Sequence, residues 1–262
     1  MLERASAGRE LGWFFALALG AAAVLHGSIA LLGLRFSLSA ESPALSLYLL
    51  GLASPTAAAL VLSGSTGRWH FLRCALRVRG AASVYVLALV AQPCVLALAW
   101  LLSHSGNAAA PLRLSASSGL GILAVGQLWV VLGEELGWRG FALPRLERLL
   151  SPRSATLALA LGWGVWHVPM FFVPGSLQAG EHAWEFAAAI FAWSCVHSLL
   201  YSRARPSVVP NLVFHACANV TLNLVEVPAD SRGALTAAYL LAGSGAWLLL
   251  GRTRSVEPTG NP

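Results

Sequence analysis

The sequence contains no lysine and few charged residues of either sign. Its 17 basic residues are all arginines, 11 residues are acidic, and charged residues make up 11% of the 262 positions, against roughly 25% in a typical soluble domain. Without lysine, the chain can form neither a lysine Schiff base nor a Walker-type phosphate loop. The four cysteines show no CxxC spacing, so neither a thiolate metal site nor a disulfide framework is indicated.

Apolar residues dominate what is present. They account for 57% of the sequence, and the mean hydropathy is +0.68. So few charges cannot cover the surface of a soluble protein of this length. Because one membrane span needs about 20 apolar residues, we expect an all-α polytopic membrane protein, a bundle of about eight transmembrane helices. The expected spans are 11–34, 44–63, 81–102, 118–143, 154–173, 184–201, 206–225 and 233–250.

The arginines predict the orientation of this bundle. If the N-terminus is cytoplasmic, every arginine except Arg35, Arg113 and Arg232 falls in a cytoplasmic segment, as the positive-inside rule requires. We therefore expect both termini in the cytoplasm and the protein in the plasma (inner) membrane, with the lipid bilayer as its surroundings. The net charge of +6 is then an orientation signal, and no nucleic acid partner is expected.

Ionisable side chains inside predicted spans are candidates for function, because burying them in lipid is costly. Counted at 1.5 Å per residue from the predicted cytoplasmic arginines, four polar side chains reach a similar depth of about 15–21 Å. A site open to the cytoplasmic side is therefore predicted. We expect His197, in another span, to be structural or to form interhelical hydrogen bonds. The four residues at this depth are Glu134, His167, His215 and Asn219.

Helical spacing divides these residues by role. Glu135 and Arg139 are four apart and share a helix face, which predicts an ion pair, while Glu134 is rotated by about 100° and is expected to face a cavity. A buried carboxylate beside an imidazole can take a proton from water, which fits Glu134 with His167. His215 and Asn219, also four apart, can donate to an oxyanion. Together they predict water-mediated acyl hydrolysis without a serine or cysteine nucleophile.

Three motifs resemble those of the CPBP intramembrane proteases, which include the type II CAAX prenyl endopeptidases, the Abi proteins and lysostaphin-resistance-like proteins. EExxxR matches from Glu134 to Arg139, and HxxxN matches His215 and Asn219. FxxxH matches at His167, but Trp163 replaces the phenylalanine. We expect this replacement to affect packing more than chemistry.

The resemblance covers residues 118–225 well and implies a bundle of about eight helices whose site opens to the cytosol. It implies that Glu134 activates water with His167, and that His215 and Asn219 stabilise the oxyanion. Glu135 and Arg139 would support the site. The predicted segments are N-terminal transmembrane helices 1–3 in 1–117, a catalytic core in 118–225, and a last helix and cytoplasmic tail in 226–262.

The sequence thus predicts an intramembrane endopeptidase without a cofactor. Its expected substrate is a membrane-associated peptide or protein, including one with a lipidated C-terminus. One alternative is a zinc-dependent variant of the same protease, with Glu134, His167 and His215 as metal ligands. A transporter, or a non-catalytic membrane protein that uses the same polar cluster, is another.

Overall fold

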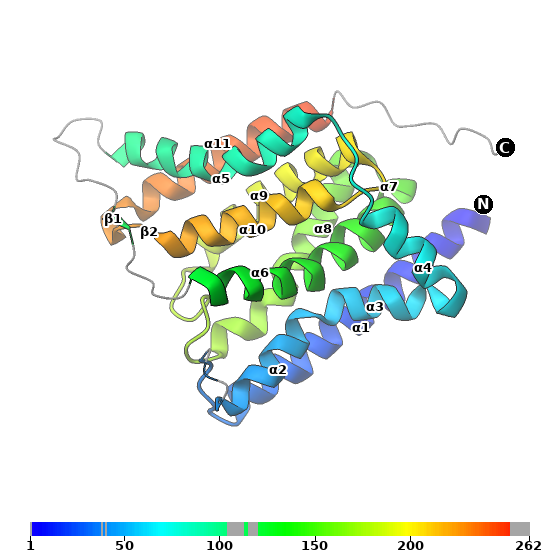
Figure 1. Ribbon diagram of the computed structural model, residues 1–262, viewed down its shortest axis with the longest axis horizontal. Helices are drawn as coiled ribbons and strands as arrows, with labels where there is room; N and C mark the ends of the chain where they lie inside the picture. Colours follow the sequence, from blue (N-terminus) through cyan, green and yellow to red (C-terminus); the bar gives the residue numbers. More distant parts are fainter. Residues whose placement is uncertain (1, 38, 40, 104–112, 115–119, 252–262) are drawn as a thin grey trace.

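A computed structural model describes residues 2–37, 39, 41–103, 113–114 and 120–251. Long helices lie side by side, with α5 and α11 along one edge, α1 to α3 along the other, and α6, α8, α9 and α10 between them (Figure 1). The elements are α1 (Leu2–Leu31), α2 (Pro43–Leu52), α3 (Ser54–Leu62), α4 (Gly64–Ala75), α5 (Ala82–Ser103), β1 (Arg113–Leu114), α6 (Leu120–Glu135), the π-helix η1 (Leu136–Ala142), α7 (Leu143–Leu149), α8 (Pro152–His167), the 3-10 helix η2 (Val168–Phe172), α9 (Ala183–Ala204), α10 (Val209–Leu224), β2 (Val225–Glu226), the 3-10 helix η3 (Ala229–Ser231) and α11 (Arg232–Leu250).

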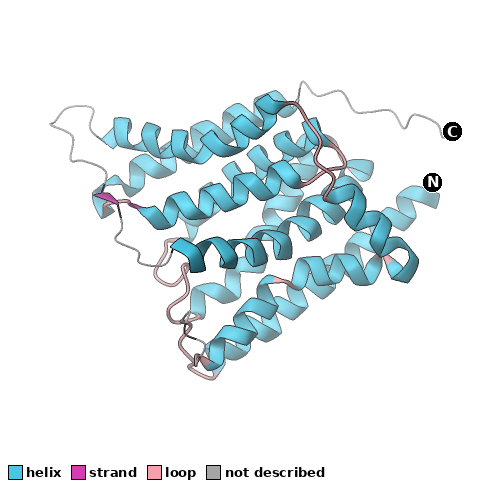
Figure 2. Ribbon diagram, viewed as in Figure 1, coloured by secondary structure: helices cyan, strands magenta, loops and turns pink. Residues whose placement is uncertain are grey.

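The described residues are almost entirely helical, as predicted (Figure 2). The strands β1 and β2 form one short antiparallel pair, with Arg113 opposite Glu226. Prolines mark several helix starts, because the first helical turn needs no N–H from them. Pro43, Pro55, Pro152 and Pro210 lie in the first turn of α2, α3, α8 and α10. All four cysteines are free.

The predicted count of eight spans is not confirmed. Five helical segments in the described part of the chain are long and apolar enough to cross a membrane, and a sixth arises if α2 and α3, bent by 47°, form one span. Helix α10 has 16 residues, or about 24 Å at 1.5 Å per residue, short of a hydrocarbon core of about 30 Å. Helix α6 also has 16 residues, but it continues directly into η1. Residues 118 and 119 of the predicted fourth span lie outside the described residues.

Both ends of the described bundle lie close to the turn between α7 and α8. The Arg4 Nε donates to the carbonyl of Arg148 at 3.3 Å, and the Arg153 Nε donates to the carbonyl of Trp247 at 3.1 Å. The start of α1 and the end of α11 therefore meet at one end of the molecule, which we call the arginine-rich end. An even number of spans requires this arrangement; the compartment that this end faces stays a prediction.

One buried apolar core extends from α1 to α11, so the three predicted segments share a core. The predicted boundary at residue 117 lies outside the described residues. Phe14 of α1 anchors the start of the site region, since its ring lies 5.3 Å from the ring of Trp138 and 5.4 Å from that of Phe141. These contacts hold the π-helix η1 against α1.

Candidate active site

The two neighbouring glutamates end helix α6, where it passes into the π-helix η1. Glycines bring this junction close to the bend between α2 and α3. A side chain at Gly133 would lie 3.0 Å from the carbonyl oxygen of Leu52, and one at Gly137 would overlap the backbone of Pro55. Only glycine fits at Gly137 without moving the neighbouring backbone. Single-turn π-helices are frequent at functional sites, and this one carries Arg139.

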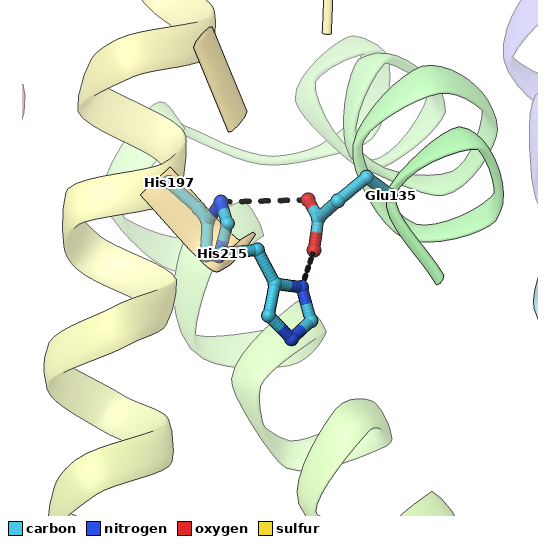
Figure 3. Close-up of side chains that lie close together, drawn as sticks. All are labelled: Glu135, His197 and His215. Atoms are coloured by element: carbon cyan, nitrogen blue, oxygen red, sulfur yellow. Dashed lines mark hydrogen bonds and ion pairs between the residues drawn. The ribbon is translucent and has the colours of Figure 1, made fainter. Parts of the chain in front are cut away.

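Glu135 is buried and contacts three nitrogen-bearing side chains, of which Figure 3 shows the two histidines. Its Oε1 accepts a hydrogen bond from the Arg139 Nη1 at 2.8 Å, so the predicted ion pair is present. The His215 Nδ1 lies 2.8 Å from the same oxygen, and the His197 Nδ1 lies 3.4 Å from Oε2. A buried charge needs such partners to be tolerated.

His197 belongs to this cluster, which sequence reasoning did not anticipate. It is fully buried on α9, and the Asn211 Nδ2 donates to its backbone carbonyl at 2.8 Å and lies 3.0 Å from its Nδ1. The interhelical hydrogen bonding expected of His197 is present, but its second contact is the carboxylate of Glu135. The feature of the sequence that could have identified His197 as part of the site is its position as an ionisable residue inside an apolar predicted span.

Glu134 has separate surroundings, as its predicted rotation away from Glu135 requires. It is 3% exposed, and its Oε2 accepts a hydrogen bond of 2.7 Å from the indole N–H of Trp163 on α8. The guanidinium carbon of Arg139 lies 4.2 Å above the Trp163 ring. The indole thus bonds directly to the predicted base, and the expectation that the replacement affects packing more than chemistry stays a prediction.

His167 is bound to the same residue through the backbone. Its Nδ1 lies 2.8 Å from the carbonyl oxygen of Trp163. A carbonyl only accepts, so the His167 Nδ1 must carry the proton, and in the neutral ring Nε2 is then an acceptor. Ring contacts with Trp166 at 4.7 Å and Phe186 at 5.0 Å fix the imidazole plane. Trp163 thus contacts both members of the predicted water-activating pair.

Asn219 lies one helical turn from His215 on α10 and is partly buried. Its Nδ2 donates to the Gln127 Oε1 of α6 at 2.7 Å. A primary amide has two N–H groups, so one is used to orient Asn219 and the second can serve a ligand. Gln127 is another residue that sequence reasoning missed, since its partner lies on a distant helix.

The group of three potential metal ligands among the described residues is Glu135, His197 and His215, whose ligand atoms lie within 4.8 Å of one another. This is not the predicted set, because Glu134 and His167 instead bond to Trp163. Some ligand atoms of the group already have partners, although the Glu135 Oε2 and the His197 Nε2 form no hydrogen bond. Arg139 shares the carboxylate of Glu135, and an amide N–H lies at the His197 Nδ1. A divalent cation would be repelled by that guanidinium, so the group fits a metal poorly.

The geometry of this site indicates which class of protein the chain belongs to. Two carboxylates and three histidines are buried among apolar helices, each held by a specific partner. Ionisable groups placed at such cost are characteristic of acid–base chemistry inside a membrane protein.

Comparison with known proteins agrees with this class. Residues 115–221 match a family model described as type II CAAX prenyl endopeptidase Rce1-like. A CAAX prenyl protease 2 from Methanococcus maripaludis is 28% identical over 105 residues, which are 38% of this chain and 39% of that protein. The aligned part of the chain thus spans well under half the length of this relative. Residues 115–221 are thus similar to the Rce1-like type II CAAX prenyl endopeptidases, and the chain is an integral membrane protein.

Proposed function

We propose that this protein is an intramembrane endopeptidase of the CAAX type, in which Glu134 activates water for peptide hydrolysis. The observation that carries the proposal is the shared contact with Trp163. Its indole N–H bonds to Glu134 and its carbonyl accepts from His167, so the two side chains are held in fixed orientations from one position. The match of residues 115–221 to an endopeptidase family supports the same chemistry.

In the proposed reaction, the Oε1 of Glu134 accepts a proton from water while Oε2 stays bonded to Trp163. The hydroxide forms a bond to the carbonyl carbon of the peptide. The tetrahedral intermediate then expels the amine, which takes the proton that Glu134 received. The His167 Nε2, as an acceptor, orients the attacking water. The carboxylic acid that remains passes its proton to the amine, so the products are a carboxylate and an ammonium group, and no covalent enzyme intermediate is required.

His215 and Asn219 are assigned to the oxyanion. The His215 Nδ1 faces Glu135 at 2.8 Å, so the ring is oriented and its Nε2 lies on the opposite edge. Donation from both nitrogens requires the imidazolium form, with Glu135 beside it as the negative group. The second amide N–H of Asn219 is the other donor. Two such donors stabilise the charge that develops on the carbonyl oxygen.

We assign no metal to the reaction, because the guanidinium of Arg139 bonds to Glu135 and would repel a divalent cation there. The proposed substrate is a membrane-associated peptide or protein whose cleavage site lies near a lipidated C-terminus, reached from the cytoplasmic side of the plasma membrane. The name of the relative from Methanococcus maripaludis, a CAAX prenyl protease, supports a substrate that carries a lipid.

The test is cleavage by the purified chain in proteoliposomes. A peptide with a prenylated cysteine followed by three residues is compared with the same peptide without the lipid, and mass spectrometry locates the cut. We expect cleavage after the modified cysteine, in the presence and absence of a chelator. Failure to cut either peptide would overturn the proposal, and activity lost to a chelator and restored by zinc would overturn the assignment without metal.

A further inference from the structure

The indole of Trp163 is held rigidly at the centre of the polar cluster. It is 1% exposed, with Arg139 above its ring at 4.2 Å. Its ring centroid lies 5.8 Å from that of His215 and 5.9 Å from that of His197, both edge-on. Packed on several sides, the indole cannot turn its N–H toward another acceptor. The direction of that N–H is therefore set before substrate arrives.

The two bonds that Trp163 makes depend on its side chain to different degrees. Any residue at this position offers a carbonyl to the His167 Nδ1, because that bond uses the backbone. The bond to the Glu134 Oε2 needs an indole, and phenylalanine, which the FxxxH pattern has here, lacks a donor. Substitution by phenylalanine therefore removes the Glu134 bond and leaves the His167 bond in place.

We infer that Trp163 is a positioning residue, which fixes the carboxylate of Glu134 with Oε2 toward α8 and Oε1 toward the attacking water. This inference rests on the proposed function, in which Glu134 accepts the proton. A hydrogen bond from a fixed N–H to a carboxylate is short and strong, and the 2.7 Å separation fits that description. The carboxylate of Glu134 is thus held in one orientation.

Removing the donor affects the chemical step more than substrate binding. In Trp163→Phe, the ring remains among its neighbours but the carboxylate is free to rotate. Loss of a hydrogen bond to a charged group corresponds to a fall of about 10- to 100-fold in kcat, with KM changed by less than about 2-fold. Altered packing alone would instead lower the unfolding temperature and the yield of active protein without this division between kcat and KM.

A control indole lies on α6. The indole N–H of Trp129 donates to the backbone carbonyl of Leu49 on α2 at 2.9 Å. Trp129→Phe removes an indole donor that bonds to the backbone of α2 and not to Glu134. We expect its kcat to stay within about 3-fold of the parent value. Equal kcat values for Trp163→Phe and the parent would overturn the inference.

A spectroscopic experiment tests the bond independently of proteolysis. With 15N-labelled tryptophan, the Trp163 indole resonance is the one missing from Trp163→Phe. In Glu134→Gln this resonance should move upfield, because a neutral amide oxygen is a weaker acceptor than a carboxylate. Glu147→Gln, at the ion pair with Arg205, should leave it unmoved. An unmoved resonance in Glu134→Gln overturns the inference even if the chain proves inactive as a protease, so the two failures are distinguishable.

Discussion

Glu134 and Glu135 are adjacent in the sequence, yet their surroundings differ sharply. Glu135 lies among Arg139, His215 and His197, so its charge is balanced within the protein. Glu134 accepts from the uncharged indole of Trp163. A carboxylate with a charged partner on the same helix is suited to holding a structure together, whereas one held by a single neutral donor is available to exchange a proton. One turn of helix thus places a carboxylate with charged partners next to one that accepts from a neutral donor.

The largest effect on folding should come from removing the charged partner of Glu135. In Arg139→Met, a fully buried carboxylate loses its guanidinium, and breaking a buried pair in this way costs about 3–5 kcal/mol. The free energy of unfolding in mixed detergent micelles measures the loss. In the double variant Glu135→Gln/Arg139→Met neither member of the buried pair carries a charge, so part of the stability should return. A single variant as stable as the parent would contradict the division of roles.

The next largest effect is expected on kcat, when a residue assigned to the oxyanion is replaced. Asn219→Ala removes one proposed donor, and kcat should fall by about 10²–10³-fold, with unfolding little changed. Gln127→Ala, which acts through Asn219, should give a smaller loss of kcat. Asn223→Ala is the matched control, since Asn223 lies one turn further along α10 and donates to the Asn219 carbonyl. If Asn223→Ala lowered kcat as much as Asn219→Ala, the oxyanion assignment would be wrong.

A smaller effect on stability is expected at His197, which lies beside the carboxylate of Glu135. In His197→Ala, the Glu135 Oε2 loses its neighbouring ring and a buried space is created. Stability should fall by about 1–3 kcal/mol, with kcat affected less than in Asn219→Ala. His182 at the start of α9 has a largely exposed side chain, so His182→Ala should leave stability unchanged. An unfolding curve for His197→Ala that matches the parent would show that Glu135 does not need this neighbour.

The smallest effect is expected at the opposite end from the arginine-rich end. Arg232 pairs with Glu181 and Glu185 at 3.3 and 3.4 Å, and its side chain is 36% exposed. Exposed pairs contribute about 0–1 kcal/mol, so Arg232→Gln should change unfolding by no more than that. A larger loss would mean that this exposed ion pair contributes as much to stability as the buried pair of Glu135 with Arg139.

Local patterns in the sequence predicted much of the site. The ion pair of Glu135 with Arg139 follows from a spacing of four, and the separation of Glu134 from Glu135 follows from helical rotation. These features depend on residues close together in the chain, whose geometry is fixed by the helix itself.

Contacts between helices could not be predicted in the same way. His197, Gln127 and Asn211 join the site through partners on other elements, and a single sequence does not give the rotation of one helix against another. The π-helix at Leu136–Ala142 lies where Gly137 comes close to Pro55 on α3, a contact between elements distant in the sequence. The count of spans depended on helix lengths, and α10 is shorter than its apolar run.

The most direct test of the central claim is the kcat of Glu134→Gln in the proteoliposome assay. The substitution keeps size and shape but removes the proton acceptor, and Glu226→Gln, on the exposed strand β2, is the control. We predict a fall of about 10²–10⁴-fold for Glu134→Gln, with the unfolding transition unchanged and the control fully active. Retention of parent-level kcat by Glu134→Gln would contradict the assignment of Glu134 as the base.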